Sequence, residues 1–423
     1  MTLNPQKTSG PQRASGRPVI VAGAGPVGMT AAARLAAHGV PVVLVEAEPV
    51  PRTDWRASTF HAATMELLEG IGVTERMHAE GLVVPLYQFR DRRDGLIAQF
   101  DFGLLAAETR YPYRLQLNQQ HLVRMVHERL REDDRVELLF GSRVTGVANT
   151  EDGVSVTVET PGGTRTLDGT HMIGADGPRS TVRRSLGIDF AGYTYPERFL
   201  IVSTTVELQD LIPGLAHVNY IADPEQWLFV LRTPESWRVV LPVSPDEPIE
   251  EATAPGRLQE TLQGMVAYPD GYPIVDYQAY NVHQRVAERF RRGNVLLAGD
   301  AAHINSPIGG VGLNSGIHDV MDAAERIARI RAGDGDPEAE LAAYDAVRRH
   351  VAVEYVQADT QRNTERLRET EDAQRRATHD EMRAIAADPE RARAYMRRVS
   401  LLESVRRFGI GRPPEQSVEE ARA

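Results

Sequence analysis

The chain has 423 residues, of which 42% are hydrophobic and 25% are charged, and its formal net charge is −11 at pH 7. This composition predicts a globular protein with room for two or three domains, and the negative charge disfavours nucleic acid and anionic membranes as partners. Cysteine is absent, which excludes disulfides, thiolate catalysis and zinc sites built on cysteine.

The N-terminal segment Met1 to Gly16 is polar and contains Gly, Ser and Pro, which predicts a disordered tail. It lacks the apolar core of a secretory signal, and no apolar run in the chain reaches the length of a membrane span. We therefore expect a cytoplasmic protein without a membrane partner. The single lysine, Lys7, lies in this tail, so the chemistry must work without a buried amine.

A strand, a glycine turn and a helix are expected after the tail. The β-branched run Val19 to Val21 leads into Gly23, Gly25 and Gly28, which have GxGxxG spacing, and an Ala-rich helical segment follows. The first glycine is expected to make the turn, the second to let the backbone approach a pyrophosphate, and the third to allow close helix packing. About twenty residues later, Glu46 ends a second apolar run where such folds hydrogen-bond an adenosine ribose. The stretch predicts a dinucleotide site without deciding which dinucleotide.

The next part of the chain alternates between helices and strands. Apolar residues recur at helical spacing up to Leu68, before Gly70, and again from Gln119 to Leu130. Leu82 to Phe102 alternates weakly, which indicates strands of another layer. Short strands are also expected at 136–140, 143–147 and 154–159, followed by a hairpin turn at 161–163.

An antiparallel sheet is expected in the second half of the chain, with strands at 200–206, 227–232 and 237–243. Because this architecture differs from the opening unit, it predicts a separate domain. A last strand at 295–298 runs into a glycine-rich loop. The pattern is then helical to about Arg407, with one break at 333–337, and the end after Gly411 is expected to be frayed.

Three separated motifs suggest a family. Gly23 to Gly28, Gly174 to Gly177 and Gly299 to His303 occur in an order and spacing that resemble the single-component FAD-dependent aromatic hydroxylases, such as para-hydroxybenzoate hydroxylase. The resemblance extends from about Pro18 to Arg331. It implies an α/β fold, with a Rossmann-like FAD-binding domain, an inserted antiparallel-sheet substrate domain and a helical C-terminal region.

The resemblance also implies a division of the chain. The expected parts are a tail at 1–16, a discontinuous FAD-binding domain at 17–81, 115–187 and 286–331, a substrate-binding sheet domain at 82–114 and 188–285, a helical region at 332–412 and a frayed end at 413–423.

Roles at the cofactor follow from the same resemblance. Asp300 is expected to bind the ribityl or pyrophosphate part of FAD, and Arg56 the pyrophosphate. Gln119 and Arg124 match residues that flank the flavin, and Asp176 matches one that contacts FAD and NAD(P)H. The two aspartates could instead cap turns, and the two arginines could be solvated. The residues expected to bind FAD are Gly23, Gly25, Gly28, Glu46, Arg56, Gln119, Arg124, Asp176, Asp300, Gly312, Leu313 and Asn314.

Three residues are candidates for the substrate site. A gap-free alignment of Trp227 to Val243 with para-hydroxybenzoate hydroxylase puts Arg232 at the position that binds the substrate carboxylate, on an inward-facing strand position. The alternative is an arginine that reaches solvent. Pro307 matches a proline beside substrate and flavin, and Tyr220 is a candidate to line the pocket or deprotonate a phenol. Other matches are poor, because Asn219 replaces a phenol-binding tyrosine, so para-hydroxybenzoate itself is not expected.

The implied activity is hydroxylation of a phenol or aromatic acid, with NADPH or NADH as reductant, O2 as co-substrate and a flavin C4a-hydroperoxide as oxygen donor. The protein is expected to be a monomer or homodimer that binds no nucleic acid and no metal. The main alternative is a flavin epoxidase, reductase or Baeyer–Villiger oxygenase acting on a polyketide-like product. A flavin halogenase is disfavoured because related enzymes use a lysine near the flavin, and a redox-responsive binding protein would show no NAD(P)H oxidation.

Overall fold

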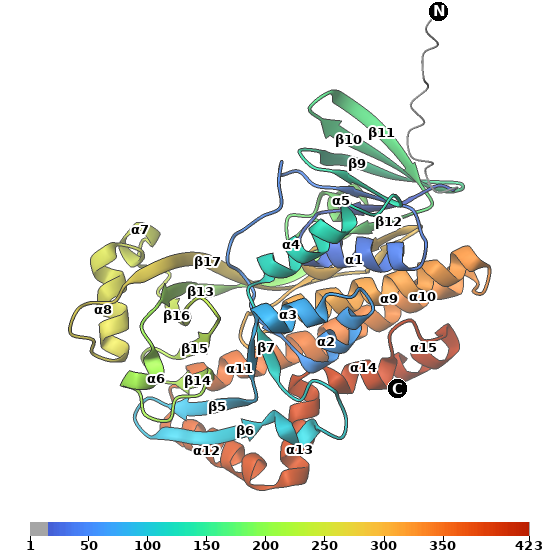
Figure 1. Cartoon of the computed structure of the whole chain (residues 1–423). Coiled ribbons are helices and arrows are strands. Elements are labelled where there is room, and N and C mark those ends of the chain that lie inside the picture. Colours follow the sequence, from blue (N-terminus) through green and yellow to red (C-terminus); the bar gives the residue numbers. More distant parts are fainter. Residues whose placement is uncertain (1–15, 423) are drawn as a thin grey trace, which may run out of the picture.

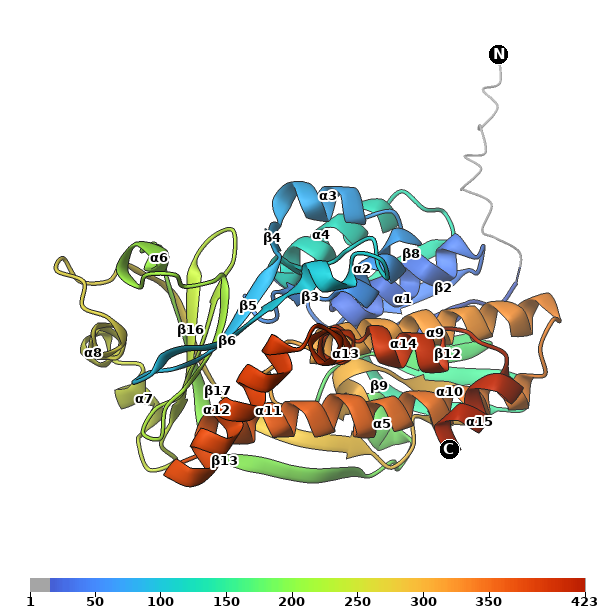
Figure 2. The same cartoon turned by 90° about the horizontal axis from the view of Figure 1, so that it is seen from below.

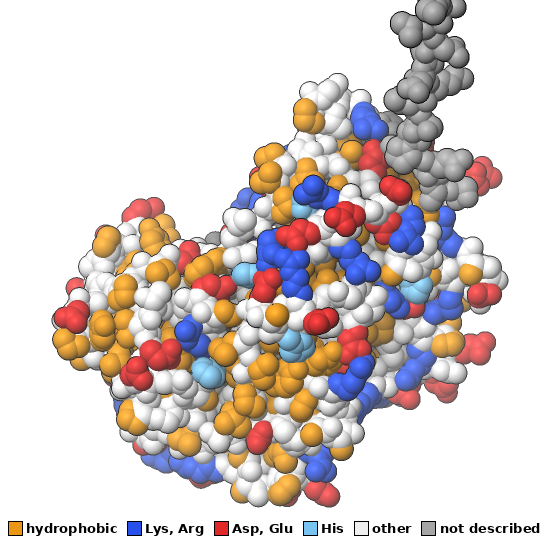
Figure 3. All heavy atoms as spheres, in the orientation of Figure 1, with side chains coloured by type: hydrophobic (Ala, Val, Ile, Leu, Met, Phe, Trp, Pro, Cys, Tyr) orange, Lys and Arg blue, Asp and Glu red, His pale blue; other side chains and the backbone are white. Residues whose placement is uncertain are grey.

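The structure is a computed structural model that describes residues 16–422 (Figure 1). The expected tail lies outside the described residues except for Gly16. Within the described chain, every helix is too short or too polar to cross a membrane. On the face seen in Figure 3, acidic and basic side chains are interspersed over the surface.

A six-stranded sheet forms the first layer, in the order β18-β19-β12-β1-β2-β8. All neighbours run parallel except β18. Its strands are short apolar runs because both faces of a parallel sheet are covered, here on one side by α1 and α9, which pack together. The elements are β1 (Val19–Ala22), α1 (Pro26–Ala37), β2 (Val42–Val45), α4 (Gln119–Leu130), β8 (Val136–Leu139), β12 (His171–Gly174), β18 (Arg291–Arg292), β19 (Val295–Leu297) and α9 (Gly312–Ala332).

An eight-stranded sheet forms the second layer, in the order β20-β17-β13-β16-β15-β14-β5-β6 (Figure 2). It is antiparallel apart from the pair β14 and β5. Its β14 was not expected from the sequence, and β13 begins well before the expected strand. The strands are β5 (Leu86–Asp91), β6 (Gly95–Asp101), β13 (Phe190–Thr204), β14 (Val218–Ala222), β15 (Leu228–Arg232), β16 (Trp237–Val243), β17 (Ile274–Ala287) and β20 (His303–Ile304).

The two faces of this larger sheet have different neighbours. The inner face carries Tyr220, Phe229 and Leu231, which share a core with apolar residues of the C-terminal helices. The outer face carries Leu228 and Val230, which share a core with α8 (Pro255–Met265). In Figure 2, α8 lies beside the sheet on the side away from the six-stranded layer.

Two small antiparallel sheets and short helices complete the fold. The hairpin expected at 161–163 joins β10 to β11, and β10 also pairs with β9. The elements are β3 (Thr59–Phe60), α2 (Ala62–Glu69), α3 (Thr74–Glu80), β4 (Leu82–Val84), η1 (Phe102–Leu105), β7 (Arg114–Gln116), β9 (Arg143–Thr150), β10 (Gly153–Thr160), β11 (Gly163–Gly169), α5 (Thr181–Ser185), α6 (Leu208–Leu211), α7 (Ile249–Ala252) and η2 (Gly299–Ala301).

The C-terminal region is helical, but it has more breaks than the single one expected. One of them is at Asp388, whose carboxylate accepts hydrogen bonds from the N–H groups of Glu390 and Arg391 and starts a new helix at Pro389. An Asp-Pro pair is a helix-start signal that could have found this break. The helices are α10 (Pro337–Val351), η3 (Ala352–Gln357), α11 (Ala358–Arg368), α12 (Asp372–Ala387), α13 (Pro389–Val399), α14 (Leu402–Phe408) and α15 (Pro414–Arg422).

The expectation of a frayed end at 413–423 is wrong for the residues that the structure describes. Pro414–Arg422 forms α15, which packs against α10 and α14. Ala421 packs on a small core made by Val347, Val351, Tyr355 and Phe408. Tertiary packing therefore stabilises a short helix that would be marginal alone.

Two buried histidines predict acid sensitivity. Burial lowers the pKa of His318 to about 3 and that of His171 to about 4. Below pH 6.5 the unfolded chain takes up protons that the folded state excludes, so stability falls by about 2 kcal/mol for each histidine at pH 5. Urea unfolding at pH 7.5 and pH 5 should show that His318→Gln loses about 2 kcal/mol less than the parent protein on acidification. Equal losses would contradict this assignment.

Candidate functional site

The glycine turn after β1 has the shape that the GxGxxG spacing predicts. Gly23 has φ +97, and a Cβ there would lie 2.4 Å from the carbonyl oxygen of Ala175. A Cβ on Gly28 would lie 1.9 Å from the carbonyl oxygen of Gly23. By contrast, Gly25 has an ordinary extended backbone at the start of α1, and a Cβ there would meet no atom within 4 Å. The helix start is therefore open at Gly25.

Glu46 at the end of β2 stabilises this turn through hydrogen bonds. Its carboxylate accepts hydrogen bonds from the N–H of Ala24 at 2.6 Å and from the N–H of Glu48 at 2.9 Å. A carboxylate has about four acceptor positions, and Glu46 is only half-buried. It therefore retains acceptor capacity for a ribose hydroxyl, and that role stays a prediction.

The three motifs meet at the carboxyl edge of the parallel sheet. The N–H of Ala175 donates to Ala22 at 2.9 Å, and the N–H of Ala298 donates to Gly174 at 3.0 Å, so β1, β12 and β19 end side by side. This edge is where open α/β sheets bind ligands. Asp300 lies here on η2 with its side chain exposed, although surrounding protein raises the pKa of its carboxyl.

A buried carboxylate stabilises the corner of the chain at Gly299 to His303, which carries Asp300. Asp319 of α9 accepts hydrogen bonds from the N–H of Gly299 at 3.0 Å, from His303 at 2.8 Å and from Arg348 at 2.8 Å. Burial by itself raises the pKa of Asp319, but His303 and Arg348 outweigh it, and the pKa is lowered. His303 is thus held in a structural network, while Asp300 is left facing outward.

Asp176 caps a helix. One of its carboxylate oxygens accepts hydrogen bonds from the N–H groups of Thr181 at 2.7 Å and Val182 at 3.1 Å, at the start of α5. This is the turn-cap alternative considered from the sequence. The other oxygen is buried and has no hydrogen-bond partner among the described residues, so a cofactor contact through that atom stays a prediction.

The remaining polar candidates have different surroundings. Arg56 is exposed and pairs with Asp54 at 2.5 Å. Arg124 pairs with Glu80 of α3 on the surface, which is the solvated arrangement considered as its alternative. The backbone N–H of Gln119 begins α4 and donates to the carbonyl of Ala57 at 2.9 Å, so α4 and the Arg56 segment are joined.

The start of α9 is held by Asn314. Its side-chain amide donates to the carbonyls of Thr59 at 2.8 Å and Gly310 at 2.7 Å, and its oxygen accepts from the N–H of His61 at 2.9 Å. No side chain caps this helix. The first N–H groups, at Gly312 and Leu313, are therefore available to an anion, which the helix dipole also favours.

An arginine of the large sheet lies behind the Arg56 segment. Arg238 on β16 is buried, stacks over Trp55 with its guanidinium carbon 5.4 Å from the ring centre, and donates to the carbonyl of Arg56 at 2.7 Å. Two of its nitrogens have no hydrogen-bond partner among the described residues. Burial lowers its pKa to about 10. These donors fit an FAD molecule that lies along the carboxyl edge of the six-stranded sheet. The open helix starts at Gly25 and Gly312 and the free carboxylate of Asp300 fit the same molecule.

A cavity lies between the inner face of the large sheet and the C-terminal helices. It is bounded by Gly309 and Val311 of the loop that follows Pro307. Tyr220 lies on its wall and stacks on Phe229, with ring centres 4.8 Å apart. Sequence reasoning missed Arg114, which also lines the cavity; its charge beside the apolar residues Leu115 and Leu117 was the available signal. Other lining residues are Tyr87, Phe89, Leu367, Met382, Tyr395 and Val399.

The expected inward orientation of Arg232 is wrong. Arg232 shares strand parity with Leu228 and Val230 and points to the outer face, where its Nε lies 3.3 Å from Glu207. Val230 and Val240, on the two strands that the alignment covers, lie on opposite faces of the sheet. A one-residue slip in a strand moves every side chain to the other face, so we do not assign Arg232 to the substrate.

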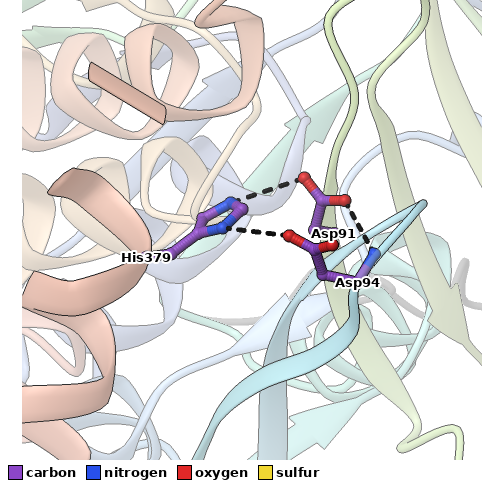
Figure 4. A group of neighbouring side chains, drawn as sticks. All are labelled: Asp91, Asp94 and His379. Carbon is purple, nitrogen blue, oxygen red and sulfur yellow. Dashed lines mark hydrogen bonds and ion pairs between the residues drawn. The ribbon is translucent and has the colours of Figure 1, made fainter. Parts of the chain in front are cut away.

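Helix α12, which forms one wall of the cavity, is linked by polar contacts to the turn between β5 and β6 (Figure 4). His379 is buried between Asp91, at 3.4 Å, and Asp94, at 3.7 Å. The two carboxylates and the imidazole resemble a metal site. However, Asp91 already accepts hydrogen bonds from two backbone N–H groups and from Arg375 at 2.7 Å. We interpret the group as a structural contact that fixes the position of α12 and thereby keeps Met382 in the cavity wall.

Comparison with known proteins identifies flavin-dependent relatives. Residues 17–359 match a family described as "FAD binding domain". The chain is 34% identical over 362 residues to para-nitrophenol 4-monooxygenase of Pseudomonas sp. strain WBC-3, covering 84% of this chain and 89% of that protein. The crystal structure of p-nitrophenol 4-monooxygenase from Pseudomonas putida DLL-E4 superposes with a TM-score of 0.86 at 30% identity, covering 92% of this chain and 98% of that one. The crystal structure of aklavinone-11 hydroxylase with FAD and aklavinone superposes with a TM-score of 0.73 at 28% identity, covering 83% of this chain and 69% of that one.

Proposed function

Because the chain belongs to the FAD binding domain family and is an FAD-dependent aromatic monooxygenase, we propose that it hydroxylates a small phenol or aromatic acid, with NAD(P)H as reductant and O2 as oxidant. In the balanced reaction, one oxygen atom is inserted into a C–H bond of the aromatic ring to give a hydroxyl group, and the other leaves as water. NAD(P)H supplies two electrons and a proton, and a second proton comes from solvent. When bound, FAD supplies the redox chemistry that links these steps.

The observation that carries the proposal is the position of the aromatic cavity. The loop from Pro307 to Val311 connects it directly to the start of α9, where the expected flavin contacts begin. An aromatic substrate in this cavity would lie on the wall formed by Tyr220 and next to that loop. The C-terminal helices cover the other side and exclude water, which protects an oxygen-transfer step from side reactions.

The chain's own residues then have separable tasks. The open backbone at Gly25 would approach the pyrophosphate, and the carboxylates of Glu46 and Asp300 would accept hydrogen bonds from hydroxyl groups of the ribose and ribityl parts. The first N–H groups of α9 would stabilise negative charge on the reduced ring. Tyr220 would hold the substrate ring by stacking.

The size of the relatives favours a single-ring substrate over a polyketide. The chain spans nearly all of the solved p-nitrophenol 4-monooxygenase but about two thirds of the solved aklavinone-11 hydroxylase. The cavity is also closed by side chains from three different helices, namely Leu367, Met382 and Tyr395. Any aromatic ligand requires some of these side chains to move, and a polyketide requires more of them to move.

Oxidation of NADPH and NADH by the purified holoenzyme tests the proposal. Addition of 4-nitrophenol or a substituted phenol should stimulate oxidation of the nicotinamide. Mass spectrometry should find a product that has gained one oxygen atom or, where oxygen enters at the carbon that bears the nitro group, a product that has lost this group as nitrite. Aklavinone tests the polyketide alternative. Turnover of aklavinone with no response to any phenol would overturn the proposal, and so would an absence of nicotinamide oxidation with every compound.

A further inference from the structure

We infer that Arg114 is the substrate-recognition residue of the cavity and that it binds an oxyanion carried by the aromatic ring, either a phenolate or a carboxylate. This inference deepens the proposed function, on which it rests. It replaces Arg232, which lies on the outer face, with an arginine that the fold brings from β7 into the cavity.

The first observation is that Arg114 is buried without a counter-ion. The residue is 2% exposed, and it forms no ion pair with any of the described residues. One terminal nitrogen donates to the Tyr220 hydroxyl at 3.2 Å, while the buried Nε has no partner. Desolvating a guanidinium is costly unless an anion or several acceptors compensate it. The Tyr220 hydroxyl is a single acceptor, so most of the five N–H donors of the Arg114 guanidinium have no acceptor in the protein.

The second observation is what surrounds the guanidinium. Its central carbon lies 4.7 Å from the ring centre of Tyr87, 5.3 Å from that of Phe102 and 6.0 Å from that of Tyr220. Aromatic faces hold a cation in place by their negative quadrupoles without using its N–H donors. Arg114 is therefore fixed in orientation while its donors stay available to a ligand.

The other charged groups of the cavity are already paired. Asp359 accepts two hydrogen bonds from Arg398, at 2.8 and 3.0 Å. Arg366 pairs with Glu381 at 3.0 Å. Arg114 is thus the lining cation that lacks a carboxylate partner in the described part of the chain. An anionic ligand would complete the charge balance, whereas a cationic one would not.

The remaining walls define the rest of the ligand. Phe89, Val311 and Met382 are apolar, and Tyr220 offers a ring face. A flat aromatic ring suits these walls, and an oxyanion on its rim suits the planar fork of the guanidinium, which can bind two oxygens or one oxygen with two donors. The position of Gly309 on the same wall sets this ring beside the loop that follows Pro307.

Binding measured on the FAD-loaded protein tests the inference without requiring turnover. Three ligands are titrated by the change in flavin absorbance: 4-nitrophenolate, 4-methylbenzoate and the neutral ether 4-nitroanisole. Arg114→Met should raise the Kd of the ligand that binds through its oxyanion by roughly tenfold to a hundredfold. It should change the Kd of 4-nitroanisole by less than about threefold. The anion that responds identifies the phenolate or the carboxylate as the recognised group.

Three variants complete the design. Arg366→Met, which removes a paired arginine of the same cavity, should leave the preference for anions unchanged. Tyr220→Phe should weaken anion binding only a little, because it removes one hydrogen bond but keeps the ring. If Arg114→Met does not retain FAD, Arg114→Lys provides the test, because it keeps the charge and loses the fork, and anion binding should still weaken severalfold.

Several results would overturn the inference. These are equal effects of Arg114→Met on the anions and the ether, unchanged binding of both anions in the Arg114 variants, or no preference of the parent protein for anions over the ether. Nicotinamide oxidation stimulated by neutral aromatics alone would also refute it while leaving the proposed function intact.

Discussion

Gly28→Ala is expected to destabilise the protein by roughly 3 kcal/mol or more, even without FAD. The new methyl carbon would lie 1.9 Å from the carbonyl oxygen of Gly23. Neither atom can move freely, because Gly23 donates its N–H to Val45 at 2.8 Å and is itself close to Ala175. Urea unfolding of the apoprotein measures the loss. A variant as stable as the parent would show that helix and turn are not packed as tightly as the structure indicates.

Gly25→Ala is the matched control for that experiment. It lies in the same turn, its extended backbone suits alanine, and its Cβ would meet no atom of the protein. Because alanine is a poorer helix N-cap than glycine, the apoprotein should lose at most about 1 kcal/mol relative to the parent. FAD affinity should nevertheless fall by at least about tenfold, because the methyl group occupies the space through which the backbone approaches the pyrophosphate. Unchanged FAD affinity would remove Gly25 from the site.

Asp319→Ala is expected to destabilise the fold by about 3 to 5 kcal/mol, since it leaves the buried His303 and Arg348 without their shared carboxylate. The lowered pKa of Asp319 gives the pH dependence. Stability contributed by a carboxylate with a lowered pKa is present above its unfolded value, near 4, and is lost as the pH falls toward the folded value. The parent and the variant should therefore differ most above pH 4 and converge in stronger acid.

Asp300→Ala is the matched control, because Asp300 belongs to the same corner but is exposed and accepts no hydrogen bond from the described residues. The apoprotein should unfold at the same urea concentration as the parent, while the purified variant should contain less FAD. Loss of stability without loss of FAD would reverse the roles that we assign to the two aspartates. If Asp319→Ala does not yield folded protein, Asp319→Asn retains the shape of the side chain and allows the same measurement.

Local patterns predicted much of the FAD-binding layer. The turn at Gly23 depends on a positive φ that glycine adopts readily, and β1 is an apolar run because both faces of its sheet are covered. The bounds that the sequence predicts for β15 and β16 also lie close to the observed ones. These features are encoded within a few neighbouring residues, so they are visible without the fold.

Features that depend on distant partners were not predicted. The helix at Pro414–Arg422 is formed where a frayed end was expected, because its partners lie on α10 and α14. The side of the sheet on which Arg232 lies depends on strand register. That register is fixed by pairing with neighbouring strands and by burial of Trp237 on the outer face.

The sequence by itself determined that this chain has a dinucleotide turn, that Glu46 ends the second strand of the unit, and that the three glycine-containing motifs resemble those of FAD-dependent hydroxylases. Only the tertiary structure decided which arginine faces the cavity. Arg114 and Tyr220 are separated by more than a hundred residues of chain but lie within hydrogen-bond distance. Their meeting depends on how β7 packs against the large sheet, and the burial that leaves Arg114 without a counter-ion arises only from that packing.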